Sequence, residues 1–175
     1  MTSGTIIDSN RISCISPTVE RPGYVPLTIA YEGEKYTSET LKYLYYDTPE
    51  IASFSPTCGP VTGYTQITLI GKNFIDMGFG KVKCYFNGTY VMNATIVDTE
   101  TILCDSPPLP VSDGFEMVNG TAPWYNISIS LNGKEFVTAK TKFIYYVDPT
   151  IKSVSPSFGP ISGGTLSKIV GEGFN

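Results

Sequence analysis

Residues 53–63 read SFSPTCGPVTG, and residues 153–163 repeat the same turn signals as SVSPSFGPISG. Each copy precedes an apolar alternating run, TQITLIGKNF after the first and TLSKIVGEGFN after the second. Proline removes a strand hydrogen-bond donor and favours extended geometry in the residue before it, while glycine accepts φ values that other residues avoid. We therefore expect the first strand to break at Pro56 and to pass from one sheet to the other.

A second repeat sets the domain boundaries. TIIDSNRISCISP at 5–17 matches TIVDTETILCDSP at 95–107, an offset of 90 residues, whereas the opening motif recurs after 100 residues. The difference places an insertion in the loop 108–123. Fixed internal periods are typical of tandem arrays of one supersecondary unit.

The repeat predicts three parts. Residues 49–148 are expected to form one complete domain, residues 1–48 the C-terminal half of a preceding domain, and residues 149–175 the N-terminal part of a third. A half-domain cannot bury its apolar face alone, so a longer tandem array is one interpretation of these ends, and an arbitrary boundary is the other.

Within 49–148 the apolar residues alternate with polar ones, which is typical of short half-buried strands. Asn132–Gly133 predicts a hairpin turn, and Gly71 predicts a bulge at the end of the second strand. The pattern indicates an all-β antiparallel sandwich of the immunoglobulin-like kind. The side chains expected to face inward are Ile67, Leu69, Val82, Cys84, Phe86, Ile102, Cys104, Tyr125, Ile127, Ile129, Leu131, Phe143 and Tyr145.

The opening motif P-x-I-x-S-x-S-P-x-x-G-P-x-x-G-x-T, followed by V-x-C-x-F and I-x-C-x-S-P, resembles the IPT/TIG domain. The resemblance covers the whole chain, as one full and two partial copies. It implies tandem immunoglobulin-like (E-set) β-sandwiches. Members of that family occur in plexin and growth-factor-receptor ectodomains, many-copy protist surface proteins, starch-processing enzymes and Rel-type transcription factors, so the fold alone implies little about function.

Composition excludes several function classes. The chain has no histidine, which excludes Ser-His-Asp and Cys-His catalysis and histidine-ligated metals. Its net charge is −4 and it has no basic run, which argues against nucleic-acid binding. No apolar run approaches the roughly 20 residues of a membrane span. We therefore expect no enzyme activity, no cofactor and no direct membrane insertion in this segment.

Four Asn-x-Ser/Thr sequons, the acceptors of N-linked glycans, begin at Asn87, Asn93, Asn119 and Asn126. Asn126 is expected on the polar face of its strand with Ser128 and Ser130, Asn87 in a turn and Asn119 in the insertion. Surface asparagines without glycans are the alternative interpretation. Glycans imply the secretory pathway, and hence an extracellular or cell-surface location.

The cysteines agree with an oxidising compartment. Cys84 and Cys104 share the inward phase, and a disulfide between them would close a loop of about 20 residues. Two buried free thiols are the alternative. Cys14 is the repeat equivalent of Cys104, so its partner is expected before Met1. Phe158 replaces Cys58 in the later copy. Three interpretations of Cys58 are open: pairing with Cys84 or Cys104, a free thiol, or a copy-specific or intermolecular contact.

Other side chains give weaker signals. Asp47, Glu50 and Asp148 lie near the domain junctions, where a calcium site is one interpretation and solvated charge the other. In each of the tyrosine pairs Tyr45–Tyr46 and Tyr145–Tyr146, one member is expected in the core and the other at the surface or at a packing interface. The candidate carbohydrate-binding aromatics are Trp124, Tyr125 and Tyr90.

The leading functional hypothesis is a structural or adhesive module of an extracellular glycoprotein, whose partners are neighbouring repeats in a homo-polymer or fibre, or a cell-surface molecule. Short junctions that contain proline favour a stiff rod. The alternatives are a receptor ectodomain segment of the plexin kind and a carbohydrate-binding accessory module. Rel-type DNA binding is the weakest alternative, because the chain is acidic.

Overall fold

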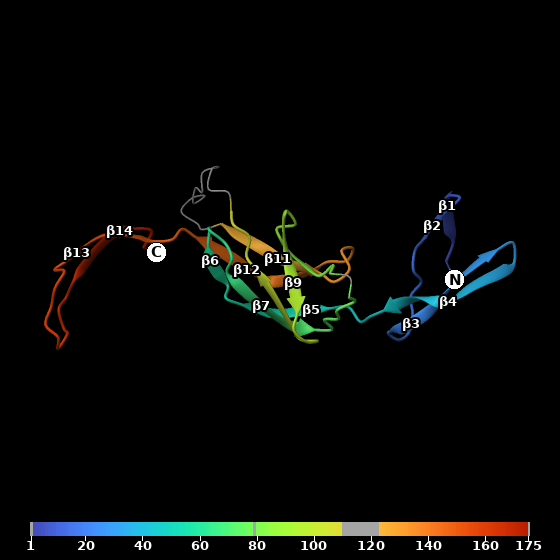
Figure 1. Cartoon of the computed structure of the whole chain (residues 1–175), viewed down its shortest axis with the longest axis horizontal. Helices are drawn as coiled ribbons and strands as arrows, with labels where there is room; N and C mark the ends of the chain where they lie inside the picture. Colours follow the sequence, from blue (N-terminus) through green and yellow to red (C-terminus); the bar gives the residue numbers. More distant parts are fainter. Residues whose placement is uncertain (1, 79, 110–122, 175) are drawn as a thin grey trace. The chain divides into compact units, whose positions relative to one another are not determined.

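The computed structural model describes residues 2–78, 80–109 and 123–174, and every regular element within them is a β-strand. Contacts divide the chain into two compact units, Met1–Thr48 and Pro49–Asn175. The all-β class expected from the alternating pattern is confirmed (Figure 1).

The first unit contains two separate antiparallel pairs. Strand β1 (Gly4–Asp8) pairs with β2 (Arg11–Cys14), and β3 (Gly23–Tyr31) pairs with β4 (Glu34–Tyr45). At the β1–β2 turn, the guanidinium of Arg11 donates to the carboxylate of Asp8, with 2.7 Å between Nε and Oδ2. This hydrogen bond and the backbone amide of Asn10 lower the pKa of Asp8.

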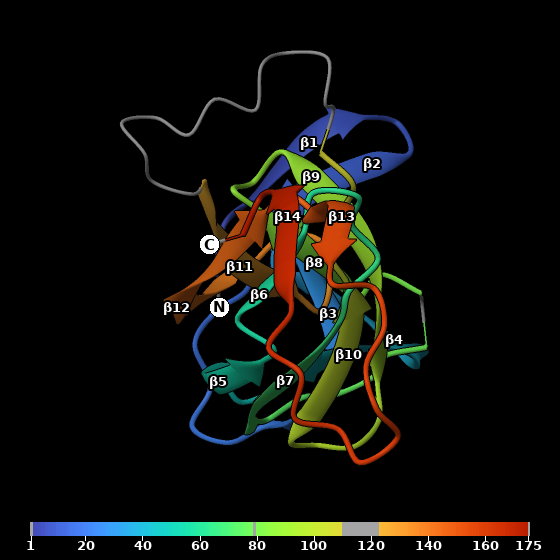
Figure 2. The same ribbon diagram turned by 90° about the vertical axis from the view of Figure 1, so that its left-hand side faces the viewer.

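The second unit is built around a single curled sheet of eight strands in the order β5-β7-β10-β9-β8-β11-β12-β6. Figure 2 shows β7 and β10 side by side, as their antiparallel register requires. A separate antiparallel pair, β13 with β14, follows in the chain. The strands are β5 (Glu50–Ser55), β6 (Cys58–Pro60), β7 (Gln66–Lys72), β8 (Lys83–Phe86), β9 (Tyr90–Ile96), β10 (Thr101–Asp105), β11 (Trp124–Ser130), β12 (Val137–Tyr146), β13 (Thr150–Ser155) and β14 (Lys168–Glu172).

The first strand changes layer at the predicted place. Strand β5 pairs antiparallel with β7, and after a cis Ser55–Pro56 peptide β6 pairs with β12. The β6–β12 pairing is parallel, whereas the sequence predicts an antiparallel sandwich. The pairing differs because the chain passes from β7 to β12 at the break without reversing its direction. Strand β6 therefore runs in the same direction as β12, the last strand of the domain.

The core follows the predicted alternation closely. All the side chains expected to face inward are buried, except Tyr125, which is half-buried. The prediction for Ser130 is wrong, because this residue was expected on the polar face but is 1% exposed. Its hydroxyl accepts the Gly133 N–H at 2.8 Å, which satisfies a buried polar group where the strand ends.

The hairpin predicted at Asn132–Gly133 is present. It joins β11 to β12, but through six residues, 131–136, and not through a two-residue turn. The Asn132 Oδ1 accepts the backbone N–H groups of Lys134 at 2.9 Å and Glu135 at 3.2 Å. The side chain therefore organises the loop, as asparagine commonly does in turns.

Gly71 is needed because of a close backbone approach. A Cβ at this position would lie 1.9 Å from the Glu50 carbonyl oxygen and 2.5 Å from Cζ of Phe74. The predicted bulge is present at this place, but on the partner strand, where the register shifts between Ile51 and Ser53. Gly171 repeats the arrangement, with its Cβ position 2.0 Å from the Thr150 carbonyl oxygen.

Glycines of the opening motif serve two different purposes. Gly63 has a φ of +77°, and a Cβ there would lie 2.4 Å from the Pro108 nitrogen. Gly59 does not have a positive φ. It is required because a Cβ would lie 2.4 Å from Oγ1 of Thr65.

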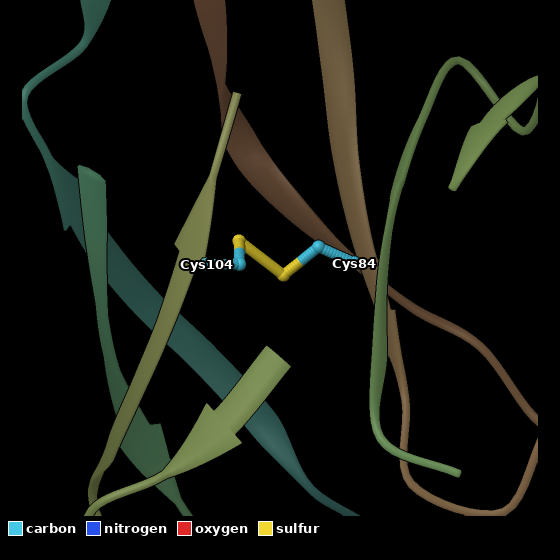
Figure 3. Close-up of a disulfide and its surroundings, with 2 residues drawn as sticks. All are labelled: Cys84 and Cys104. Atoms are coloured by element: carbon cyan, nitrogen blue, oxygen red, sulfur yellow. A yellow bond between two sulfur atoms is a disulfide. The ribbon is translucent and has the colours of Figure 1, made fainter. Parts of the chain in front are cut away.

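A disulfide joins strands that are not hydrogen-bonded to each other. Strand β9 lies between β8 and β10, and the sheet curls so that Cys84 on β8 reaches Cys104 on β10 with 6.5 Å between their Cα atoms (Figure 3). Both cysteines are buried. In the chain-entropy model a bridge closing a loop of this size stabilises the fold by about 3 kcal/mol.

Substitution of Gly71 by alanine should lower the free energy of unfolding by about 3 kcal/mol, because the backbone of Glu50 has to move. Gly133→Ala is the matched control, since its φ is +78° but no atom lies within 4 Å of its Cβ position. The control should cost about 1 kcal/mol. Urea unfolding of the whole chain measures both. Equal losses in the two variants would contradict the steric explanation.

Thiol labelling should find only Cys14 and Cys58 reactive in the unreduced chain, in denaturant as well as in buffer, because those are the free cysteines. A Cys84→Ala/Cys104→Ala variant should lose about 3 kcal/mol of stability. Cys58→Ala is the control and should lose almost none, because that side chain is exposed. Labelling of all the cysteines in denaturant without reductant would refute the bridge.

Candidate functional site

Asn87 lies at the turn between β8 and β9. Asn87 and Gly88 have φ values of 50° and 71°, which are typical of the primed turns that close two-residue hairpins. The Asn87 Oδ1 accepts the Asn126 backbone N–H at 2.8 Å, and the Asn87 N–H donates to the Asn126 carbonyl at 2.9 Å. Asn87 as a residue is exposed, and its side-chain nitrogen is the atom that a glycan would modify.

Asn126 is thus brought beside Asn87 from a distant part of the sequence. It lies on β11, exposed, and its register partner on β12 is Lys142. The register shifts only after Asn126, where β12 carries additional residues before the Ser128–Thr138 pair. The Ser128 and Thr138 hydroxyls are 2.8 Å apart and hydrogen-bonded. Two sequons therefore lie next to each other, one at the turn after β8 and one on the neighbouring strand β11.

Asn93 lies on β9 and is also exposed. Its side-chain oxygen accepts a hydrogen bond from the ammonium of Lys83, its register partner on β8. Exposure at all three positions gives a glycan room to project into solvent. Asn119, the fourth predicted acceptor, lies outside the described residues.

Cys58 lies on the edge strand β6 and is exposed. Its register partner is Ile144, whose side chain is also exposed. Cys58 therefore does not pack in the core, and its environment differs from that of the buried Cys84–Cys104 bridge.

The candidate carbohydrate-binding aromatics do not form a planar row. Trp124 is exposed, whereas Tyr125 points to the opposite side of the strand, where its ring lies 5.2 Å from that of buried Tyr145. Tyr90 packs against Tyr125 at 6.0 Å between ring centroids. Only Trp124 of the three faces outward, so sequence proximity alone gave the wrong grouping.

The tyrosine pair of the last strand divides as expected. Tyr145 is fully buried and its hydroxyl donates to the Pro107 carbonyl at 2.9 Å, while Tyr146 is exposed. Burial raises the pKa of Tyr145 above its ordinary value, and a hydrogen bond with Ser106 opposes this rise. The Tyr145 hydroxyl is therefore a structural donor that anchors the chain after β10.

Two of the charged residues near the junctions, Glu50 and Asp148, have protein partners. Glu50 forms an ion pair with Lys72 at 3.2 Å, and the Thr62 hydroxyl donates to the Asp148 carboxylate at 3.4 Å. In the part of the chain that the structure describes, no three acidic, cysteine or histidine side chains gather as a metal site. The described residues also contain no helix that is long and apolar enough to cross a bilayer.

Comparison with known proteins finds relatives in sequence and a similar solved structure. The plexin-A2 of Mus musculus is 30% identical over 155 residues, which is 85% of this chain and 8% of the plexin. The plexin-A3 of Homo sapiens is 26% identical over 160 residues, 86% of this chain and again 8% of the relative. The chain thus spans less than a tenth of these proteins.

A solved structure of the full extracellular region of plexin A4 aligns with 97% of this chain and 14% of its own, with a TM-score of 0.54 and 20% identity. At that identity the alignment supports the fold. The family model for the IPT/TIG domain matches residues 49–145, which is more than half of the chain. The chain belongs to the IPT/TIG domain family.

Proposed function

We propose that this chain is a segment of the extracellular region of a plexin-like cell-surface receptor, built from consecutive IPT/TIG sandwiches. The observation that carries the proposal is the match to plexin-A2 over 85% of the chain. A match of that length extends beyond the single domain at 49–145, so it includes sequence from a neighbouring repeat. The receptor alternative is therefore better supported than the fibre hypothesis that the repeats first suggested.

The role proposed for the segment is spacing and presentation, not chemistry. Its core is apolar and its buried hydroxyls, on Ser106, Ser130 and Tyr145, each have a hydrogen-bond partner. Such a domain holds its ends at a fixed distance. Continuation of the chain into further repeats, with 1–48 and 149–175 as parts of neighbouring domains, belongs to the same proposal.

The proposal includes modification in the secretory pathway. The described acceptors Asn87, Asn93 and Asn126 are all exposed, and a disulfide is present in the core. Both features suit an oxidising extracellular compartment. Cell-surface partners, and not nucleic acid, are the partners that this chemistry favours.

Expression behind a secretion signal in eukaryotic cells tests the proposal. We expect the chain in the medium with at least two N-glycans, removed by a glycosidase that converts each occupied asparagine to aspartate and so identifies it. A variant with glutamine at Asn87, Asn93, Asn119 and Asn126 is the control and should show no mass change. A tagged full-length gene product should label on intact cells. Retention of an unmodified chain inside the cell would contradict the proposal.

Assembly into a fibre is the second candidate, supported by the repeated motif and by junctions as short as Asp47–Pro49. It predicts self-association. Sedimentation of the native protein at increasing concentration should then show species larger than the monomer, whereas the receptor proposal expects a monomer throughout. A monomer at every concentration would count against the fibre.

A further inference from the structure

Trp124 and Asn126 lie on the same outer face of β11. They are two residues apart, and the register is regular through them, since Trp124 pairs with Ile144 and Asn126 with Lys142. Side chains at this spacing project to the same side of a strand, with Cα atoms about 6.6 Å apart. The ring of Trp124 is therefore a direct neighbour of the candidate glycan acceptor.

The ring is held in place although it is exposed. The Lys142 ammonium lies 3.1 Å from the centroid of the Trp124 ring, a cation–π contact. The Trp124 residue is nevertheless 44% exposed, and its cross-strand neighbour Ile144 is 43% exposed. The ammonium thus occupies one face of the indole, and the rest of the Trp124 side chain is a partly exposed apolar surface beside Asn126.

We propose that Trp124 is the platform on which the first sugars of an N-glycan at Asn126 stack, so that the glycan covers Trp124 and Ile144. The C–H faces of a sugar ring are apolar and pack well on an indole. Because the sugar is attached at Asn126, stacking is intramolecular and proceeds at a high effective concentration. The inference rests on the glycosylation part of the proposed function.

The other two acceptors that the structure describes, Asn87 and Asn93, lack this arrangement. Asn93 is exposed on β9, and the residue two positions before it on the same face is Val91, which has no ring. Tyr85 precedes Asn87 by two positions, but its ring packs edge-on against Phe136 at 4.8 Å. Asn87 also leaves the strand alternation through its positive φ. Asn93 is therefore the internal control for a glycan without a platform.

Trp124 is the single tryptophan of the chain, so its fluorescence reports on this contact without any substitution. The secreted 175-residue chain is prepared with only Asn126 available, by Thr89→Val, Asn93→Gln and Asn119→Gln, and compared with a chain in which only Asn93 is available. Thr89→Val removes the first sequon and keeps the Asn87 oxygen that accepts the Asn126 N–H. Removal of the Asn126 glycan should red-shift the emission and increase quenching by acrylamide. Removal of the Asn93 glycan should leave both unchanged.

Stability gives a second measurement. Loss of the Asn126 glycan should lower the Tm by about 4 °C, and Trp124→Ala should abolish this difference, while Trp124→Phe should retain part of it. If Asn126 is occupied but neither fluorescence nor Tm responds to the glycan, the stacking inference is overturned and the proposed function stands. Occupancy of other sequons but not Asn126 has the same consequence. A secreted chain with no glycan at all would overturn both.

Discussion

The curled sheet depends on the transfer of the first strand between its two ends. Strands β5 and β6 form the two edges of the eight-stranded order, yet only Pro56 and Thr57 separate them in the chain. Two residues thus tie the edges together, and β12 comes to lie against β5. The close approaches at Gly59 and Gly63 follow from this constraint, because both glycines lie where the crossing chain meets the rest of the domain.

Local patterns predicted burial well because side chains of a strand alternate regardless of which strand is its neighbour. They predicted pairing less well. The bulge lies opposite Gly71, on β5, and the β6–β12 pair is parallel, since both depend on contacts between residues remote in sequence. Ser130 is buried although it was expected on the polar face. It is the last residue of β11, and side chains no longer alternate between the two faces once the strand becomes a loop.

In the candidate site, too, local features could be predicted from the sequence and contacts between distant residues could not. The sequons are a three-residue pattern and could be found at once, but the hydrogen bond from Asn126 to Asn87 joins residues 39 positions apart and has no local signal. The neighbourhood of Trp124 and Asn126 could have been found from their spacing of two on a strand. Grouping Trp124 with Tyr125 overlooked that consecutive residues point to opposite faces.

The two sheet edges have a consequence for a chain that repeats its own sequence. Covalently linked copies of one fold are always close together, and strands of one copy can pair with another during folding. Edge β6 is only three residues long and ends in Pro60, and edge β5 is interrupted by a bulge. Short, proline-ended and bulged edges pair poorly with a neighbour. The two edges of this sheet therefore offer few positions at which a second copy of the same sequence could pair with it.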